Sequence, residues 1–146
     1  MRVLLTSCPI TDPTTAYHSL AYLAAVARER ENVDVECRDL NIEWIRYLAE
    51  DEVLSGLSQW TDKRCRTLSA NDTLTAMETI EYGRLSALPP IVAGEAQRAV
   101  EVLQSDTLFY DFVTYRKAVD TINAIILHAS AHSFPMTLDQ WQEVFN

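Results

Sequence analysis

The sequence predicts an α/β fold that starts with a Rossmann-like βαβ unit, containing a partial parallel sheet, and continues as a mainly helical extension. Within the first 45 residues, a short apolar run is followed by a helical pattern and then by an alternating apolar/polar run. After residue 45 the apolar residues recur at helical spacing, and no second alternation of strand and helix follows. We expect residues 1–45 to form the βαβ unit and residues 46–146 to form a helical extension packed on it, within one compact domain.

The first 41 residues contain a strand, a loop, a helix and a second strand. Residues 2–5 are a continuous run typical of a strand buried on both faces, and residues 6–15 form a polar, proline-containing loop. The helix should begin near Thr14 or Thr15 and end at Asn32, which tolerates the left-handed conformation. We expect Tyr22 on this helix to pack against the sheet. Residues 33–39 alternate, which indicates a strand with one wetter face or an edge strand.

The rest of the chain is divided into helices by turn and capping residues. Helical spacing recurs over residues 42–49, 53–57, 74–85, 91–103 and 115–130, and a last short helix is expected over residues 138–145. We expect a turn or helix end at 56–62, caps at Asn71 or Asp72, at Asp106 and at Thr137, and a break at Pro89 and Pro90.

Composition excludes several classes of partner and location. The formal net charge of −9, with no basic cluster, argues against nucleic acid and anionic membrane as partners. No run approaches a membrane span or a signal peptide, so we expect a cytoplasmic protein. Three widely spaced cysteines predict no disulfide framework, and three scattered glycines leave no phosphate-binding loop.

A few side chains have both a chemical and a structural interpretation. Cys8 follows the first strand and could be an activated thiol, but a small buried residue is the commoner case. His128 and His132 are four residues apart and could share a metal, although we favour a cap at a helix end. Asp39 ends the second strand and could hydrogen-bond a cofactor side chain, with plain capping by Asn41 as the alternative.

Three stretches of the βαβ region resemble the opening of cobalamin-binding radical S-adenosylmethionine enzymes. They are residues 3–9, residues 19–25 with the text Ser-Leu-Ala-Tyr-Leu-Ala-Ala, and residues 33–41, which end in Asp-Leu-Asn. The text around residues 109–135 is similar to a branch of ribosomal-peptide maturation enzymes with a long helical insertion. The resemblance implies cobalamin as the cofactor and a peptide or natural product as the substrate, modified by methyl transfer or another radical step. It places the cofactor at Ser7, Cys8, Pro9, Thr11 and Thr15, to which we add Asp39.

The sequence departs from this family at two motifs. CxxxCxxC is absent, so this chain has no ligands for the iron–sulfur cluster, and Asp-x-His-x-x-Gly is absent, so cobalt would have no ligand from that histidine. We therefore assign no catalytic residue and no metal ligand. The expected partners are the remainder of a larger enzyme or a partner subunit, and a peptide substrate. The alternative is a non-catalytic, stand-alone adaptor with a degenerate cobalamin-binding-like fold, which would bind a partner through its helices or its edge strand.

Overall fold

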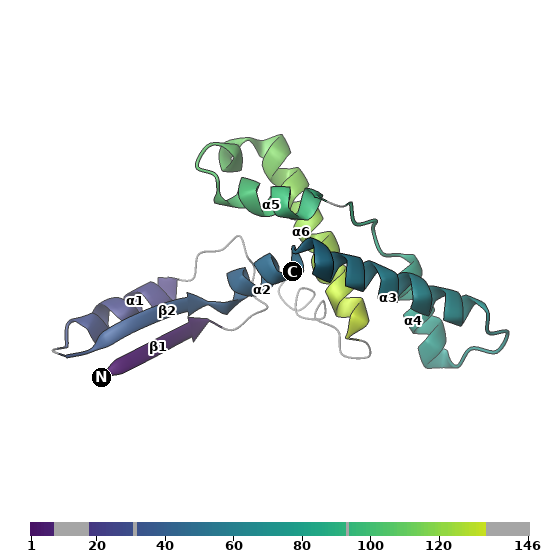
Figure 1. The fold of residues 1–146 in the computed structure, drawn as a ribbon, viewed down its shortest axis with the longest axis horizontal. Helices are drawn as coiled ribbons and strands as arrows, with labels where there is room; N and C mark the ends of the chain where they lie inside the picture. The colour runs from purple at the N-terminus through teal and green to yellow at the C-terminus, as the bar shows by residue number, and fades with distance from the viewer. Residues whose placement is uncertain (8–17, 31, 93, 134–146) are drawn as a thin grey trace. The chain divides into compact units, whose positions relative to one another are not determined.

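The computed structural model of this chain describes residues 1–7, 18–30, 32–92 and 94–133. It is a mixed α/β structure that is mostly helical, with a two-stranded parallel sheet at the start (Figure 1). This confirms the expected fold class at that level. In chain order the elements are β1 (Arg2–Ser7), α1 (His18–Arg28), β2 (Asp34–Asp39), α2 (Leu40–Leu48), α3 (Asp51–Ser69), α4 (Ala76–Ser86), α5 (Glu95–Gln104), the 3-10 helix η1 (Leu108–Tyr110) and α6 (Phe112–His132).

The chain divides into two compact units, Met1–Ile45 and Arg46–Asn146, with the boundary inside α2. In the first unit β1 and β2 pair in parallel, in a register that runs from Arg2 opposite Asp34 to Ser7 opposite Asp39. A parallel pair needs a crossover connection, and α1 lies within it and packs on both strands (Figure 1). Asn32 adopts a left-handed conformation with φ of 64°, as predicted.

Two predictions about burial in this unit are wrong. β1 is covered on one face only: its residues alternate in exposure, and Leu4 is 54% exposed. Tyr22 on α1 is exposed and does not pack on the sheet, whereas Ala24 is the helix residue buried there. The reason is that the described sheet has only two strands, and within this unit α1 covers one of its two faces.

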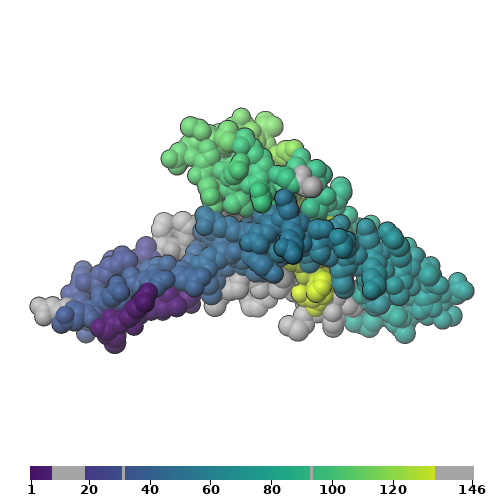
Figure 2. All heavy atoms as spheres, viewed as in Figure 1, coloured from purple at the N-terminus to yellow at the C-terminus, as the bar shows by residue number. Residues whose placement is uncertain are grey.

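The second unit is built around α6, which packs against α3, α4 and α5. α6 buries Ile122 and Ile125 almost completely, because apolar residues recur at helical spacing along its length. α5 contributes a stripe of three buried residues, Ala96, Ala99 and Val102. Figure 2 shows the atoms of α5, η1 and the first part of α6 gathered together, in the green part of the chain. None of the described helices combines the length and apolar character that a membrane crossing requires.

Several predicted boundaries in this unit are wrong. α3 continues through Gly56, where we expected a turn, because the helix is held by burial of Leu54 and Leu68 on either side. α4 is capped by Thr75 rather than by Asn71 or Asp72. Asp106 was expected to cap a stretch through Val113, but Thr107 occupies the N-cap position of η1, and α6 begins separately with Asp111 as its cap. The predicted helix at 138–145 and its cap lie outside the described residues.

Candidate functional site at the carboxyl edge of the sheet

The structure brings together two of the predicted site residues, Ser7 and Asp39. They are the last residues of β1 and β2 and lie opposite each other in the register. The Ser7 hydroxyl donates a hydrogen bond to Oδ1 of Asp39 at 2.8 Å, and both side chains are half-buried. Because the strands are parallel, the carboxyl ends of β1 and β2 lie at the same edge of the sheet. The other predicted site residues, Cys8, Pro9, Thr11 and Thr15, lie outside the described residues.

Asp39 has a structural role in addition to any binding role. Its Oδ1 accepts hydrogen bonds from the backbone N–H groups of Asn41 at 3.0 Å and Ile42 at 3.3 Å. It is therefore the N-cap of α2, and the interpretation of Asn41 as the cap is wrong. Asn41 lies within the first turn of α2 and is buried, so its side chain is in the wrong place to cap. The carboxylate of Asp39 is held in position by three donors.

A charged pair that the sequence did not predict lies beside this edge. The Arg38 guanidinium donates to Glu43 with a distance of 2.9 Å between Nε and Oε1, and a second hydrogen bond from Nη2 makes the pair bidentate. The hydrogen bond and charge of Glu43 raise the pKa of Arg38. The two charges neutralise each other. The edge thus offers hydrogen-bonding groups, Ser7 and Asp39, which suit a polar ligand better than an anion.

The two histidines considered as metal ligands bind different partners. His128 is buried, and its Nε2 lies 2.8 Å from the carbonyl oxygen of Pro89. His132 packs its ring on Trp60, with ring centroids 4.5 Å apart. His132 does lie in the last turn of α6, but His128 belongs to the core and is not a helix cap. Across the described residues, no group of three or more potential ligands could hold a metal ion.

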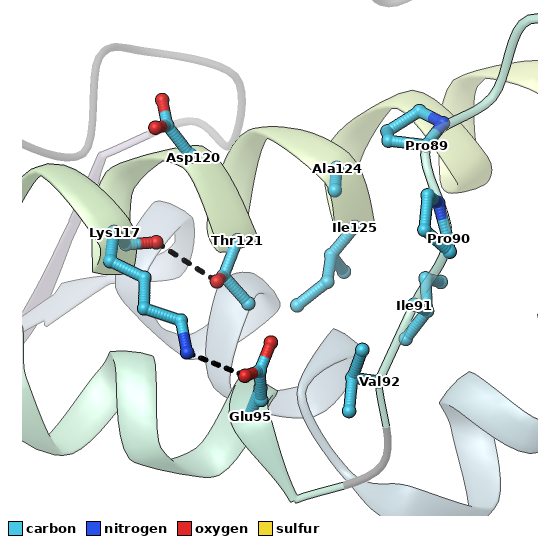
Figure 3. A pocket seen from close by; sticks show the side chains of 10 residues that line it. All are labelled: Pro89, Pro90, Ile91, Val92, Glu95, Lys117, Asp120, Thr121, Ala124 and Ile125. Atoms are coloured by element: carbon cyan, nitrogen blue, oxygen red, sulfur yellow. Dashed lines mark hydrogen bonds and ion pairs between the residues drawn. The ribbon is translucent and has the colours of Figure 1, made fainter.

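A shallow cleft in the helical unit is a second candidate site, and sequence reasoning missed it. Its volume is about 190 Å³, and it is lined by residues 89–92, by Glu95 and by one face of α6 (Figure 3). Figure 3 shows Lys117 reaching across to Glu95, and Nζ donates to that carboxylate at 2.6 Å. The cation and the carboxylate neutralise each other, so the cleft is a mainly apolar niche. The sequence signal for it is the break at Pro89 and Pro90, which alone does not show that α6 lies opposite.

Comparisons of this chain with protein-family models, with curated proteins and with solved structures find no match. We therefore infer function from the residues and geometry of the chain. Of the two sites, the carboxyl edge is the one that combines residues singled out from the sequence with the position at which open α/β sheets bind ligands.

Proposed function

We propose that this chain forms the cofactor-facing wall of a cobalamin-binding radical S-adenosylmethionine enzyme. The enzyme would modify a peptide or natural product by methyl transfer or another radical step. The iron–sulfur cluster would be supplied by the remainder of a larger enzyme or by a partner subunit, because the cluster motif is not in this sequence. The proposal rests on the resemblance of residues 2–41 to the opening of that family.

The single observation that supports a ligand at this place is the Ser7–Asp39 pair at the carboxyl ends of two parallel strands. Open α/β sheets bind their ligands beyond these strand ends. A serine hydroxyl and a carboxylate suit hydrogen bonding to the amide side chains on the rim of a corrin. They are poor candidates for holding cobalt, so the proposal is for cobalamin bound by its periphery.

The test is titration of the purified chain with hydroxocobalamin, followed by the visible spectrum and by desalting. We expect retained corrin, and a combined Ser7→Ala/Asp39→Asn variant should bind about 10-fold more weakly, the loss expected for one or two hydrogen bonds. Asn is chosen because it preserves the cap of α2. The matched control is Asp34→Asn, at the opposite end of β2. An unchanged spectrum with no corrin after desalting would exclude cofactor binding by this chain alone.

A second candidate function is the adaptor, and one observation favours it. Tyr110, Phe112 and Val113 are all exposed at the junction of η1 and α6. Exposed aromatic residues that lie together are typical anchors of a protein–protein interface. Two results together would favour this function. The chain takes up no cobalamin, and Tyr110→Ser/Phe112→Ser abolishes its binding to a partner. The control Met77→Ser/Ile80→Ser, which removes two exposed apolar residues from α4, should leave that binding intact.

A further inference from the structure

The two edges of the described sheet differ in chemistry. Each strand has one neighbour, so among the described residues each has an edge without a strand partner. β1 carries three apolar residues, Val3–Leu5, in its middle, and Leu4 is 54% exposed. β2 instead places Asp34, Glu36 and Arg38 at alternate positions, and all three are exposed. Charged side chains on an edge strand discourage pairing with another strand, so the β1 edge is the one suited to accept a strand.

α1 presents an apolar flank on the side of the unit where the edge of β1 is open. Nη2 of Arg28 donates to the carbonyl oxygen of Val35 at 3.2 Å, which places Arg28 on the β2 side of the helix. Successive helical residues are about 100° apart, so Leu23 and Val26 lie about 140° and 160° around the axis from Arg28. They therefore face the β1 side, where Leu23 is 52% and Val26 is 43% exposed. The open β1 edge and this flank of α1 lie on one side of the unit, which we call the apolar side; the Leu4 side chain points to the sheet face that α1 does not cover.

We propose that a second copy of this chain covers this apolar side, by pairing its β1 antiparallel to this β1 about a two-fold axis at Leu4. In this register Leu4 faces the partner's Leu4, and Val3 faces the partner's Leu5. Arg2 faces the partner's Thr6, so apolar residues oppose apolar residues and no like charges meet. Pairing two β2 strands about Glu36 would instead bring two carboxylates together. The dimer uses no cofactor, so it goes beyond the proposed function.

The same symmetry brings the two α1 helices together. A two-fold axis perpendicular to the sheet leaves both helices on the same face. α1 packs on both strands, and more extensively on β2, so with a strand spacing of about 4.8 Å the two helix axes would lie about 10–14 Å apart. The shorter end of this range matches the distance of about 8–10 Å between packed helices. Leu23 and Val26 of each copy would then face the other copy, while the two Leu4 side chains would meet on the opposite face of the sheet.

The test is the mass of the full chain by light scattering or sedimentation, over a concentration range of about 2–200 µM. We expect a rise from 16.6 kDa to twice that mass. Leu4→Lys should weaken the dimer at least about 10-fold, since two ammonium groups would meet at the axis. The variant should still fold, because position 4 lies opposite Glu36 within the same chain. Ile80→Lys is the matched control, on the exposed surface of α4, and should dimerise like the wild type.

A charge swap separates disruption of the interface from misfolding. Leu4→Glu should also be monomeric, although its carboxylate lies opposite Glu36 in the same chain. An equimolar mixture of Leu4→Lys and Leu4→Glu should form a mixed dimer, since opposite charges then meet at the axis, and this dimer would show that both variants fold. A mass of 16.6 kDa at every concentration, or a dimer that Leu4→Lys does not weaken, would overturn the proposal. A monomer that nevertheless retains cobalamin would overturn the dimer alone and leave the proposed function standing.

Discussion

Replacing Glu81 by glutamine should destabilise the helical unit by about 2 kcal/mol, because it breaks the most buried of the ion pairs found in the described residues. Arg64 on α3 donates to Glu81 on α4 through Nε and Nη2, and both distances are 2.7 Å. The hydrogen bonds that Arg64 donates to the Glu81 carboxylate raise the pKa of Arg64. The pair lies in the region where Leu68 and Leu85 form an apolar cluster, so it joins two helices that also share a core.

The magnitude follows from the exposure of the two side chains. Breaking a fully buried pair by removing one partner costs about 3–5 kcal/mol, whereas an exposed pair contributes about 0.2–1 kcal/mol. The Glu81 side chain is 10% exposed and the Arg64 side chain is 34% exposed. When its partner is lost, the guanidinium can be partly rehydrated. The expected value therefore lies between the two limits, at about 2 kcal/mol.

The assay is urea unfolding followed by helical circular dichroism, for Glu81→Gln, Arg64→Met and the double variant. This cycle isolates the coupling energy between the two residues, which should be about 1.5–2 kcal/mol. The matched control is the same cycle on Arg98 and Glu101, an exposed pair with a 3.1 Å separation on α5, where the coupling should be below about 0.5 kcal/mol. Equal coupling in the two cycles would refute the argument from burial.

Three further predictions concern the helix caps and the buried histidine. The Glu78 carboxylate accepts the backbone N–H and the hydroxyl of Thr75, which lowers the pKa of Glu78. The contribution of Glu78 to stability is therefore present above its ordinary pKa of 4.5 and is lost as the pH falls through the lowered value. On acidification, the urea midpoint of the wild type should drop more than that of Glu78→Gln. Equal drops would contradict this prediction. Asp39→Ala should reduce amide-exchange protection at the start of α2 by about 1 kcal/mol, whereas Asp39→Asn should stay close to the wild type, so similar losses would exclude the capping role. His128→Leu removes the hydrogen-bond partner of the Pro89 carbonyl and should cost about 1–3 kcal/mol in urea unfolding, and an unchanged midpoint would show that this bond adds nothing.

The elements that follow from local patterns were predictable from the sequence. Strands expected over residues 2–5 and 33–39 form at Arg2–Ser7 and Asp34–Asp39, Asn32 is left-handed, and α6 follows the apolar spacing of residues 115–130. The strands, the left-handed Asn32 and α6 depend on neighbours a few residues away. The pairing of Ser7 with Asp39 was not predicted, because residues 6–15 were expected to form a loop, whereas β1 extends to Ser7.

The features that depend on distant residues could not be predicted. Gly56 looked like a helix end, but α3 continues because residues on both sides of it are buried. Several polar residues before a helix were equally plausible caps, and the choice of Thr75 depends on where α4 begins, which packing decides. The spacing of His128 and His132 suggests a ligand or a helix cap, but His128 bonds the carbonyl of Pro89, which lies 39 residues earlier in the chain. Local spacing does not show this contact.

The sequence by itself determined the βαβ start and the helical character of the rest, since these follow from the two periods of strand and helix. The tertiary structure alone decided which faces are covered. It showed that Leu4 is exposed on an uncovered face and that Leu23 and Val26 lie on the side of the open β1 edge. The physical reason is that periodicity shows which residues share a face, whereas exposure depends on what other parts of the chain bring against that face.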